Sequence, residues 1–354
     1  MVKRLVVYLV TAVMLAGCSK PAAQAPRPHI ISYSPSVTDT LIDLGLEQHL
    51  VGVTSWCMLP AGVTKPIVGS ESAINTETVL ELQPDLIFVQ QKTEKFDPLL
   101  KRLPSCRVVS VKTDSVEGVL QSIRTIGQEV DKAGPQPLGA AEKAEKLSAG
   151  VRRQLEEIRR KAPTRRPRVL FVMGHDHPYT TGRDTYLHEL IEIAGGVNAA
   201  GETYTGWKSI NVEVILALAP EVLICQTTPT EEGAARTYWS ALKDLPAVKA
   251  GRVVVTTDCR LTIFGSRIGD SAQQLALWMH GASSTASSGP AAAAASRRAA
   301  PPISPKTARA AAMMLCLQNP RPLPGPTVLS GDPIAFISMG PPRLETGSFL
   351  GGRP

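Results

Sequence analysis

Hydrophobic and polar positions between residues 29 and 280 alternate in blocks that predict an α/β fold. Short unbroken apolar runs, which are typical of strands buried on both faces, are separated by segments with a helical period. Glycines at 45 and 195–196 are placed to close two of the helices. Because strands and helices alternate, we expect mostly parallel sheets with short connections. The predicted strands cover 29–33, 50–54, 86–89, 107–111, 168–173, 222–225 and 252–256, and further helices are predicted over 37–44 and 186–194.

One seventeen-residue pattern occurs twice in the chain. Residues 74–90 read INTETVLELQPDLIFVQ, residues 210–226 read INVEVILALAPEVLICQ, and seven positions are identical at a constant offset of 136. Each copy predicts a short helix with an asparagine N-cap and an acid in its first turn, stopped by a proline ahead of a buried strand. A repeat of this kind indicates one supersecondary unit used twice, and therefore two similar lobes.

The segment 139–162 (GAAEKAEKLSAGVRRQLEEIRRKA) predicts one long helix between the two copies. Its apolar residues recur at steps of three and four, and Glu142–Lys146 and Glu156–Arg160 are ion pairs in the favoured order. A lone coiled-coil segment is the alternative, but the position between the repeats favours a connecting strut. We therefore expect an N-terminal lobe over 29–138 and a C-terminal lobe over 163–280.

The first residues predict export and a lipid anchor. Lys3 and Arg4 precede an apolar run, too short to span a bilayer, that ends in Leu15-Ala16-Gly17-Cys18. This ending resembles the lipobox of bacterial lipoproteins, which implies a signal peptide over 1–17, a lipidated Cys18 and a polar tether over 18–28. The alternative is an ordinary cleaved signal with a coincidental cysteine. Either way the chain is expected outside the cytoplasm, and with the lipid it is anchored to a membrane.

Residues 281–354 differ in composition from the rest of the chain. Alanine, serine, proline and arginine dominate, no period survives, and seven basic against two acidic residues carry +5 of the formal net charge of +7. We expect a low-complexity disordered tail. The remainder is close to neutral and holds no basic helix, so the charge argues against a nucleic-acid partner.

Motifs of enzymes and of metal or redox sites are missing from the sequence. There is no G-x-S-x-G elbow, phosphate loop, dinucleotide fingerprint, H-E-x-x-H or C-x-x-C, and the cysteine spacings specify no disulfide. His175-Asp176-His177 invites a metal or haem interpretation, but no third ligand accompanies it, which favours a surface loop. We expect neither covalent chemistry, nor a cofactor, nor a bound metal ion.

Several motifs together resemble one family of receptors. They are HIISYSPSVTDTLIDLG, LVGVTSWCMLP, INTETVLELQPDLI, PYTTGRDTYLHELIEIAGGVN, GWKSINVEVILALAPEVLI and, less fully, FGSRIGDSAQQLALWMH, all between residues 28 and 280. In this order and spacing they resemble the class III periplasmic binding proteins, which serve importers of vitamin B12, siderophores and haem. The resemblance implies two α/β lobes joined by one long helix, and an ABC permease homodimer with its ATPase as partner.

The resemblance also implies two docking acids. In this family one glutamate on each lobe docks into arginine pockets of the permease, and the matching residues here are Glu77 and Glu213. A two-fold permease offers two equivalent basic pockets, so a monomeric receptor needs two equivalent acids. The alternative for each is a favourable charge at a helix start.

Ligand-side residues follow from the rule that binding occurs beyond the carboxyl ends of strands. That rule selects Ser34, Ser36, Trp56, Cys57, Gln90, His175 and Tyr179. The resemblance adds Trp207 as a cleft aromatic and Arg267 near the cleft. A second cleft aromatic of the family is absent here, and Glu71 stands in that region. Each tryptophan could instead pack in the core or between lobes, and Arg267 could instead bridge helices.

The expected ligand is a metal chelate, either a corrinoid such as vitamin B12 or a ferric siderophore, held between the lobes with indole rings against it. Two alternatives remain open: a haem or free zinc or manganese receptor, and a structural or sensory lipoprotein without a transport role.

Overall fold

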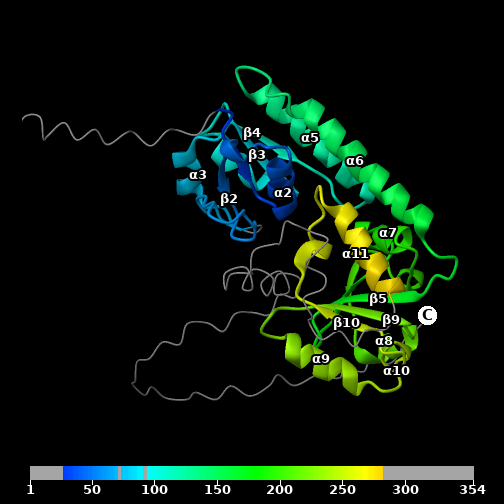
Figure 1. The fold of residues 1–354 in the computed structure, drawn as a ribbon. Helices are drawn as coiled ribbons and strands as arrows, with labels where there is room; N and C mark the ends of the chain where they lie inside the picture. Colours follow the sequence, from blue (N-terminus) through cyan, green and yellow to red (C-terminus); the bar gives the residue numbers. More distant parts are fainter. Residues whose placement is uncertain (1–26, 71–72, 91–93, 282–354) are drawn as a thin grey trace, which may run out of the picture. The chain divides into compact units, whose positions relative to one another are not determined.

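The computed structural model describes residues 27–70, 73–90 and 94–281 and contains two β-sheets (Figure 1). We call the first sheet and the helices between its strands the N-terminal lobe. The second sheet and the helices between its strands form the C-terminal lobe. The first sheet has four parallel strands in the order β2-β1-β3-β4. They are β1 (Ile30–Ser32), β2 (Leu50–Val53), β3 (Leu86–Val89) and β4 (Arg107–Ser110).

The second sheet has a parallel half and an antiparallel half. Strands β10, β9 and β5 are parallel, β7 pairs with β5 in parallel, and β6 and β8 continue the sheet as antiparallel strands. The bounds are β5 (Arg168–Met173), β6 (Tyr179–Thr181), β7 (Val197–Asn198), β8 (Trp207–Ser209), β9 (Val222–Gln226) and β10 (Val253–Thr256). The structure thus confirms an α/β fold with mostly parallel sheets and adds the antiparallel ribbon β6–β8.

The repeated segments fold into the same unit. Helices α3 (Thr76–Leu82) and α8 (Val212–Leu218) start at Asn75 and Asn211, whose side chains accept hydrogen bonds from the backbone N–H three residues later, at 3.3 and 3.0 Å. Both helices end at a residue in the left-handed region, Gln83 with φ 46° and Ala219 with φ 44°. Each then runs into the central strand of its sheet, as the sequence predicts.

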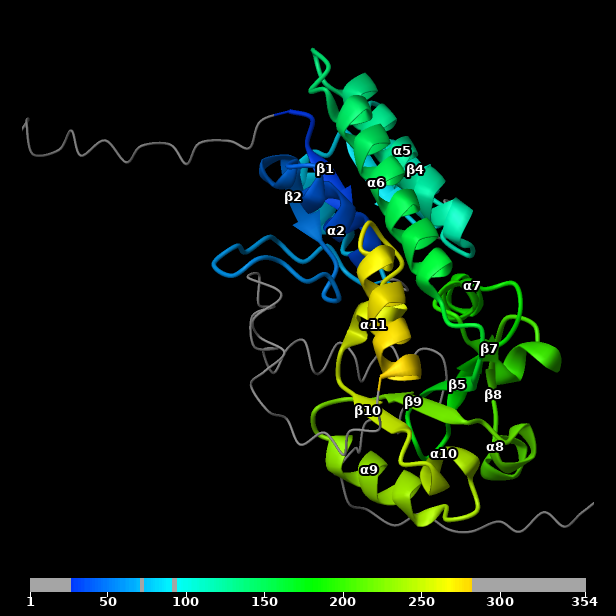
Figure 2. The same ribbon diagram turned by 45° about the vertical axis from the view of Figure 1, so that its right-hand side comes forward.

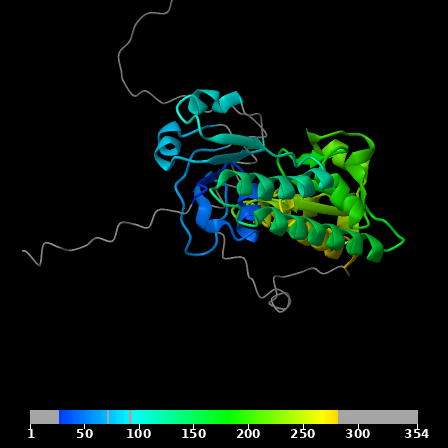
Figure 3. The same cartoon turned by 90° about the horizontal axis from the view of Figure 1, so that it is seen from above.

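A pair of long helices follows the first sheet. Helix α6 (Ala140–Lys161) occupies the range predicted for the connecting helix, and α5 (Val116–Ala133), which the sequence analysis leaves unassigned, packs along its length (Figure 3). Gly127 of α5 allows this approach, since a Cβ there would lie 2.5 Å from the Ala144 Cβ. The last helix, α11 (Ile268–His280), lies beside α6 and α7 (Figure 2). The other helices are α2 (Pro35–Asp43), α4 (Asp97–Leu100), α7 (Tyr186–Ile193), α9 (Glu232–Ala241) and α10 (Pro246–Lys249), with short 3₁₀ turns η1 (Glu47–His49), η2 (Glu94–Phe96), η3 (Ala199–Glu202) and η4 (Cys259–Thr262).

Buried apolar side chains from both sheets form one large cluster with α2, α5, α6, α7 and α11. Each sheet also has one smaller apolar cluster on its other face. Within the described ranges, none of the helices combines the length and the apolar character needed to cross a membrane. The predicted signal peptide, Cys18 and tail residues 282–354 lie outside the described residues.

Candidate functional site

In each sheet there are two neighbouring strands whose connections run in opposite directions along the sheet. In the first sheet the pair is β1 and β3, and in the second it is β5 and β9. In open α/β sheets, ligands bind outside the carboxyl ends of strands at such switch points. The candidate site therefore consists of the residues that follow these four strands.

The N-terminal strand end is a network of hydroxyls around one amide. Ser34, a predicted site residue, is buried and its hydroxyl lies 2.9 Å from that of Ser36. The Nε2 of Gln90, at the end of β3, donates to the hydroxyls of Ser36 at 2.7 Å and Thr113 at 2.9 Å. Ser32 further ties the β1 end by donating to the Ser34 carbonyl. This end is polar, but its groups are paired with one another.

The C-terminal strand end carries unpaired polar atoms instead. Gln226 ends β9 with 8% of its surface exposed, and its Nε2 donates to Thr262 Oγ1 at 3.0 Å. Its Oε1 is buried without a hydrogen-bond partner among the described residues, and so is the Nδ1 of His175 in the loop after β5. Buried polar atoms are satisfied in the great majority of cases, so two orphans at one strand end call for an explanation.

An aromatic ribbon adjoins this strand end. Tyr179 of β6 pairs with Met173, the last residue of β5, and Trp207 stands on β8 opposite Thr181. The rings of Tyr179 and Trp207 stack 6.1 Å apart at an interplanar angle of 6°, and both residues are half-buried. Phe171 completes the group in a T-shaped arrangement with Trp207, with 6.3 Å between the ring centroids. Two predicted ligand residues are thus brought together as one partly exposed, stacked aromatic pair.

Trp56 takes a different position. It lies after β2 with only 6% of its surface exposed, and its indole N–H has no hydrogen-bond partner among the described residues. In this structure the ring therefore packs inside the protein, as in the alternative weighed from the sequence. Its unpaired N–H is the one group that it could offer to an acceptor.

Arg267 forms an ion pair with Asp43 at the end of α2, with 3.0 Å between guanidinium and carboxylate. Ser266 donates to the same carboxylate at 2.7 Å. These contacts tie the start of α11 to the N-terminal lobe. Nearby, burial raises the pKa of Asp39 to about 6; the Arg267 charge opposes this shift and the Asp43 charge adds to it.

Glu77 and Glu213 lie at the starts of α3 and α8, and α8 begins shortly after β8 of the aromatic ribbon. Both are exposed, and both stand second in their helix after an asparagine cap. Charges at these positions are compatible with the helix dipole and open to a partner. The geometry places the two predicted docking residues at equivalent positions of equivalent units.

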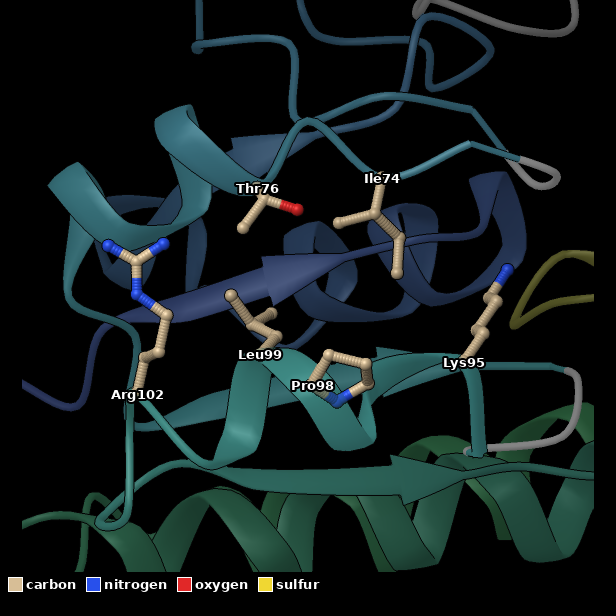
Figure 4. Close-up of a pocket in the computed structure, with 6 residues that line it drawn as sticks. All are labelled: Ile74, Thr76, Lys95, Pro98, Leu99 and Arg102. Atoms are coloured by element: carbon tan, nitrogen blue, oxygen red, sulfur yellow. The ribbon is translucent and has the colours of Figure 1, made fainter.

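A groove of about 420 Å³ lies at the start of α3, where Thr76 lines it (Figure 4). Ile74, Pro98 and Leu99 form its apolar part, while Lys95 and Arg102 stand at its two ends. The groove belongs to the N-terminal lobe, and none of its lining residues takes part in the hydroxyl network around Gln90.

The cysteines of the described residues are buried or half-buried, and no metal-binding group occurs among these residues. Burial raises the pKa of Cys225 to about 12 and that of Cys259 to about 11, so both thiols stay protonated at neutral pH. Cys57, Cys106, Cys225 and Cys259 are free. No group of three histidine, cysteine or acidic side chains within these residues could hold a metal ion, and His177 only approaches Asp176, at 3.7 Å.

Comparison with protein families decides the class of the molecule. The model of the family described as "Periplasmic binding protein" matches residues 30–258, which is most of the described chain. The chain belongs to this family. Its members are transport components without enzymatic activity, and the chain is accordingly a substrate-binding receptor.

Individual relatives agree with this assignment. An uncharacterized ABC transporter substrate-binding lipoprotein, YvrC of Bacillus subtilis, is 28% identical over 76% of this chain and 93% of its own length. A cobalamin-binding protein of Halobacterium salinarum is 24% identical over 72% of this chain and 70% of its own length. Among solved structures, the periplasmic heme-binding protein RhuT from Roseiflexus sp. RS-1 matches with a TM-score of 0.62 at 24% identity, covering 72% of this chain and 99% of its own.

The sequence does not single out Gln226 or Asp39 as site residues. The signal for Gln226 is its identity with Gln90 in the repeat, which marks it as the last residue of a central strand. Asp39 gives no signal, because its burial depends on how the start of α11 meets α2 in this periplasmic binding protein.

Proposed function

We propose that the chain is the extracytoplasmic receptor of an ABC importer and captures a metal chelate, either a corrinoid or a ferric siderophore. The observation that carries the proposal is the stacked pair of Tyr179 and Trp207 at the strand end of the C-terminal lobe. Aromatic rings bury a large area against flat apolar partners, and pockets for small molecules combine such surfaces with a few polar groups. The unpaired atoms of Gln226 and His175 supply those polar groups.

The delivery step uses the two exposed helix starts. Glu77 and Glu213 insert into two equivalent basic pockets of a permease homodimer, and Cys18 carries the lipid that keeps the receptor near it. The equal placement of the two acids on α3 and α8 supports this arrangement. Charge complementarity of this kind raises association rates and fixes orientation.

Haem is the second candidate ligand. The similarity to the fold of the heme-binding RhuT favours it, and Tyr179 or His175 would then be the axial ligand. The same aromatic surface suits a porphyrin as well as a corrin ring.

Titration by tryptophan fluorescence tests the proposal. The full chain carrying Cys18→Ala, which removes the lipid anchor, is titrated with cyanocobalamin, cobinamide, haemin and ferric siderophores. We expect saturable quenching by one of these chelates at micromolar Kd or tighter, weakened about tenfold by Trp207→Ala. The matched control is Trp278→Phe, on α11 and outside the aromatic ribbon. Absence of binding by every chelate, or equal losses in the two variants, contradicts the proposal.

A further inference from the structure

Helix α8 is apolar around most of its circumference, although much of it is exposed. Its sequence, VEVILAL, contains one charged residue, Glu213, and six apolar residues. Only Ile215 and Leu218 are buried, and these two pack into an apolar cluster of the C-terminal lobe. Leu216 keeps 41% of its surface exposed and is one of three large apolar residues of the described chain that are open to solvent to this degree.

The other apolar residues of α8 surround Glu213. Val212 and Val214 flank it in the sequence and are half-buried, while Leu216 and Ala217 follow it by about one turn and are exposed. We name these four residues the apolar collar. Helices at the surface of a soluble protein normally present polar residues on the side that faces away from the core. Apolar residues gathered on an exposed face therefore indicate a partner that covers them.

Helix α3, the other copy of the repeat, shows that the fold does not require the apolar collar. It reads TETVLEL, and three of the four collar positions are polar there, namely Thr76, Thr78 and Glu81. Both helices nevertheless have an asparagine cap and end at a left-handed residue. The leucine is the one collar residue that both copies share, as Leu80 and Leu216. The complete collar is therefore a property of α8 and not of the repeat.

The acid within the apolar collar restricts what can cover it. A lipid bilayer or an uncharged protein surface would bury the Glu213 carboxylate without a counter-charge, which is costly. A second copy of this chain, joined α8 to α8 around a two-fold axis, would bring two like charges together. Residues 281–354 carry an excess of basic residues, but one such segment cannot serve both Glu213 and the equivalent Glu77. A permease with two equivalent basic pockets can serve both acids.

We propose that α8 docks through apolar contact as well as charge, and that the permease surrounds the basic pocket for Glu213 with apolar side chains that the collar covers. This inference rests on the proposed function and names a second component of the docking surface. Burial of apolar surface is favourable at any salt concentration, whereas attraction between exposed charges is weakened by salt. Docking of the C-terminal lobe should therefore keep part of its affinity at high salt.

The test transplants the polar residues of α3 onto α8. The graft variant Val212→Thr/Val214→Thr/Ala217→Glu has the α3 residue at each of these positions and leaves the Glu213 carboxylate in place. Its added carboxylate should strengthen a contact made by charge alone, so a loss of affinity reports missing apolar contact. The matched control is the reciprocal variant on α3, which consists of Thr76→Val, Thr78→Val and Glu81→Ala.

Affinity for the permease is the main measurement. The full chain with Cys18→Ala, alone or with either set of substitutions, is bound to the cognate permease–ATPase complex in nanodiscs at 0.1 and 1 M salt, with empty nanodiscs alongside. We expect the graft variant to bind about ten times more weakly at both salt concentrations and the reciprocal variant to lose less than twofold. The thermal unfolding midpoint of the graft variant should stay unchanged, because the replaced side chains are exposed or half-buried.

A second pair of variants tests the leucine of the collar. Leu216→Ser should weaken binding to the permease by about fivefold. Leu277→Ser is the matched control, since Leu277 lies on α11 with 59% of its surface exposed, and it should change the affinity by less than twofold. Equal effects of the two variants contradict a specific role of the collar.

Three further results overturn the inference. An unchanged affinity of the graft variant, or equal losses in the graft and reciprocal variants, shows that the collar makes no specific contact with the permease. Weaker binding together with a lower unfolding midpoint shows that the collar packs against another part of the chain. Binding of the parent to empty nanodiscs that the graft variant loses shows a membrane contact instead. If the parent does not bind the permease complex at all, the proposed function fails as well.

Discussion

The two lobes are alike at their helix starts and different at their strand ends. Helices α3 and α8 share the asparagine cap, the acid in the first turn and the left-handed last residue. At the strand ends, the N-terminal lobe has a network of hydroxyls around Gln90 and the unpaired indole N–H of Trp56. The C-terminal lobe has unpaired atoms on Gln226 and His175 and an antiparallel aromatic ribbon.

This difference separates two tasks. A partner with two-fold symmetry needs the same feature twice, so the repeat is preserved where docking is proposed. A single asymmetric ligand needs different groups on its two sides, so the copies diverge where binding is proposed. The comparison therefore predicts that changes at helix starts affect transport and changes at strand ends affect affinity.

The largest expected effect is on uptake. Replacing both Glu77 and Glu213 by alanine should reduce transport in vesicles containing the cognate permease by about a hundredfold or more, because two charge-assisted contacts are lost together. Each single substitution should have an intermediate and similar effect. Uptake of radiolabelled ligand measures this.

Glu81→Ala serves as the control, since Glu81 is an exposed acid on the same helix as Glu77. It should leave uptake within about twofold of the parent, since an exposed single charge outside the contact contributes little. A loss as large as that of the double variant would contradict specific docking by the two helix-start acids.

The next effect concerns the junction between α2 and α11. Burial raises the pKa of Asp39 to about 6, so the folded protein holds this proton more tightly than the unfolded chain does. The contribution of Asp39 to the free energy of unfolding therefore falls as the pH rises from about 4 to about 6. Asp39→Asn should raise the free energy of unfolding at pH 8 by about 1–2 kcal/mol, and the gain should disappear below pH 4. Urea denaturation across this pH range measures it.

Asp43→Asn is the matched comparison on the same helix. It removes the carboxylate that binds Arg267 and Ser266, so it should lower stability at pH 8 by about 1 kcal/mol instead of raising it. If both variants shift stability in the same direction, the assigned roles of the two acids are wrong.

The smallest effect distinguishes the helix ends of the two lobes. Ala219 has a positive φ without any compensating side-chain contact, and Ala219→Gly should stabilise the protein by about 0.5–1 kcal/mol. Gln83 has the same backbone strain, but its side chain donates to the Leu80 carbonyl at 2.6 Å. Gln83→Gly should therefore give almost no gain. Equal gains in thermal unfolding experiments would show that the Gln83 contact contributes nothing.

Most elements of the fold can be predicted from local patterns in the sequence. Asparagine caps, the prolines after the repeated helices and the unbroken apolar strands depend on near neighbours, and these elements form where the sequence predicts them. The long helix α6 follows from its helical period in the same way. The equivalent placement of Glu77 and Glu213 could be predicted for the same reason, because both residues belong to the repeat.

Features that depend on distant contacts could not be predicted. Helix α5 contains two glycines that weaken its local helical signal, and the need for Gly127 is visible only against α6. The ribbon β6–β8 joins segments about thirty residues apart. Likewise, the burial of Trp56 and the pairing of Arg267 with Asp43 depend on how loops and helices meet in space.

One measurement tests the separation of docking from binding most directly. The Kd of the identified chelate is determined by isothermal titration for the parent chain, the double variant Glu77→Ala/Glu213→Ala, and Trp207→Ala. The account predicts an unchanged Kd, within twofold, for the double glutamate variant and a Kd about ten times weaker for Trp207→Ala. Weaker binding by the double glutamate variant, together with an unchanged Kd for Trp207→Ala, would contradict it.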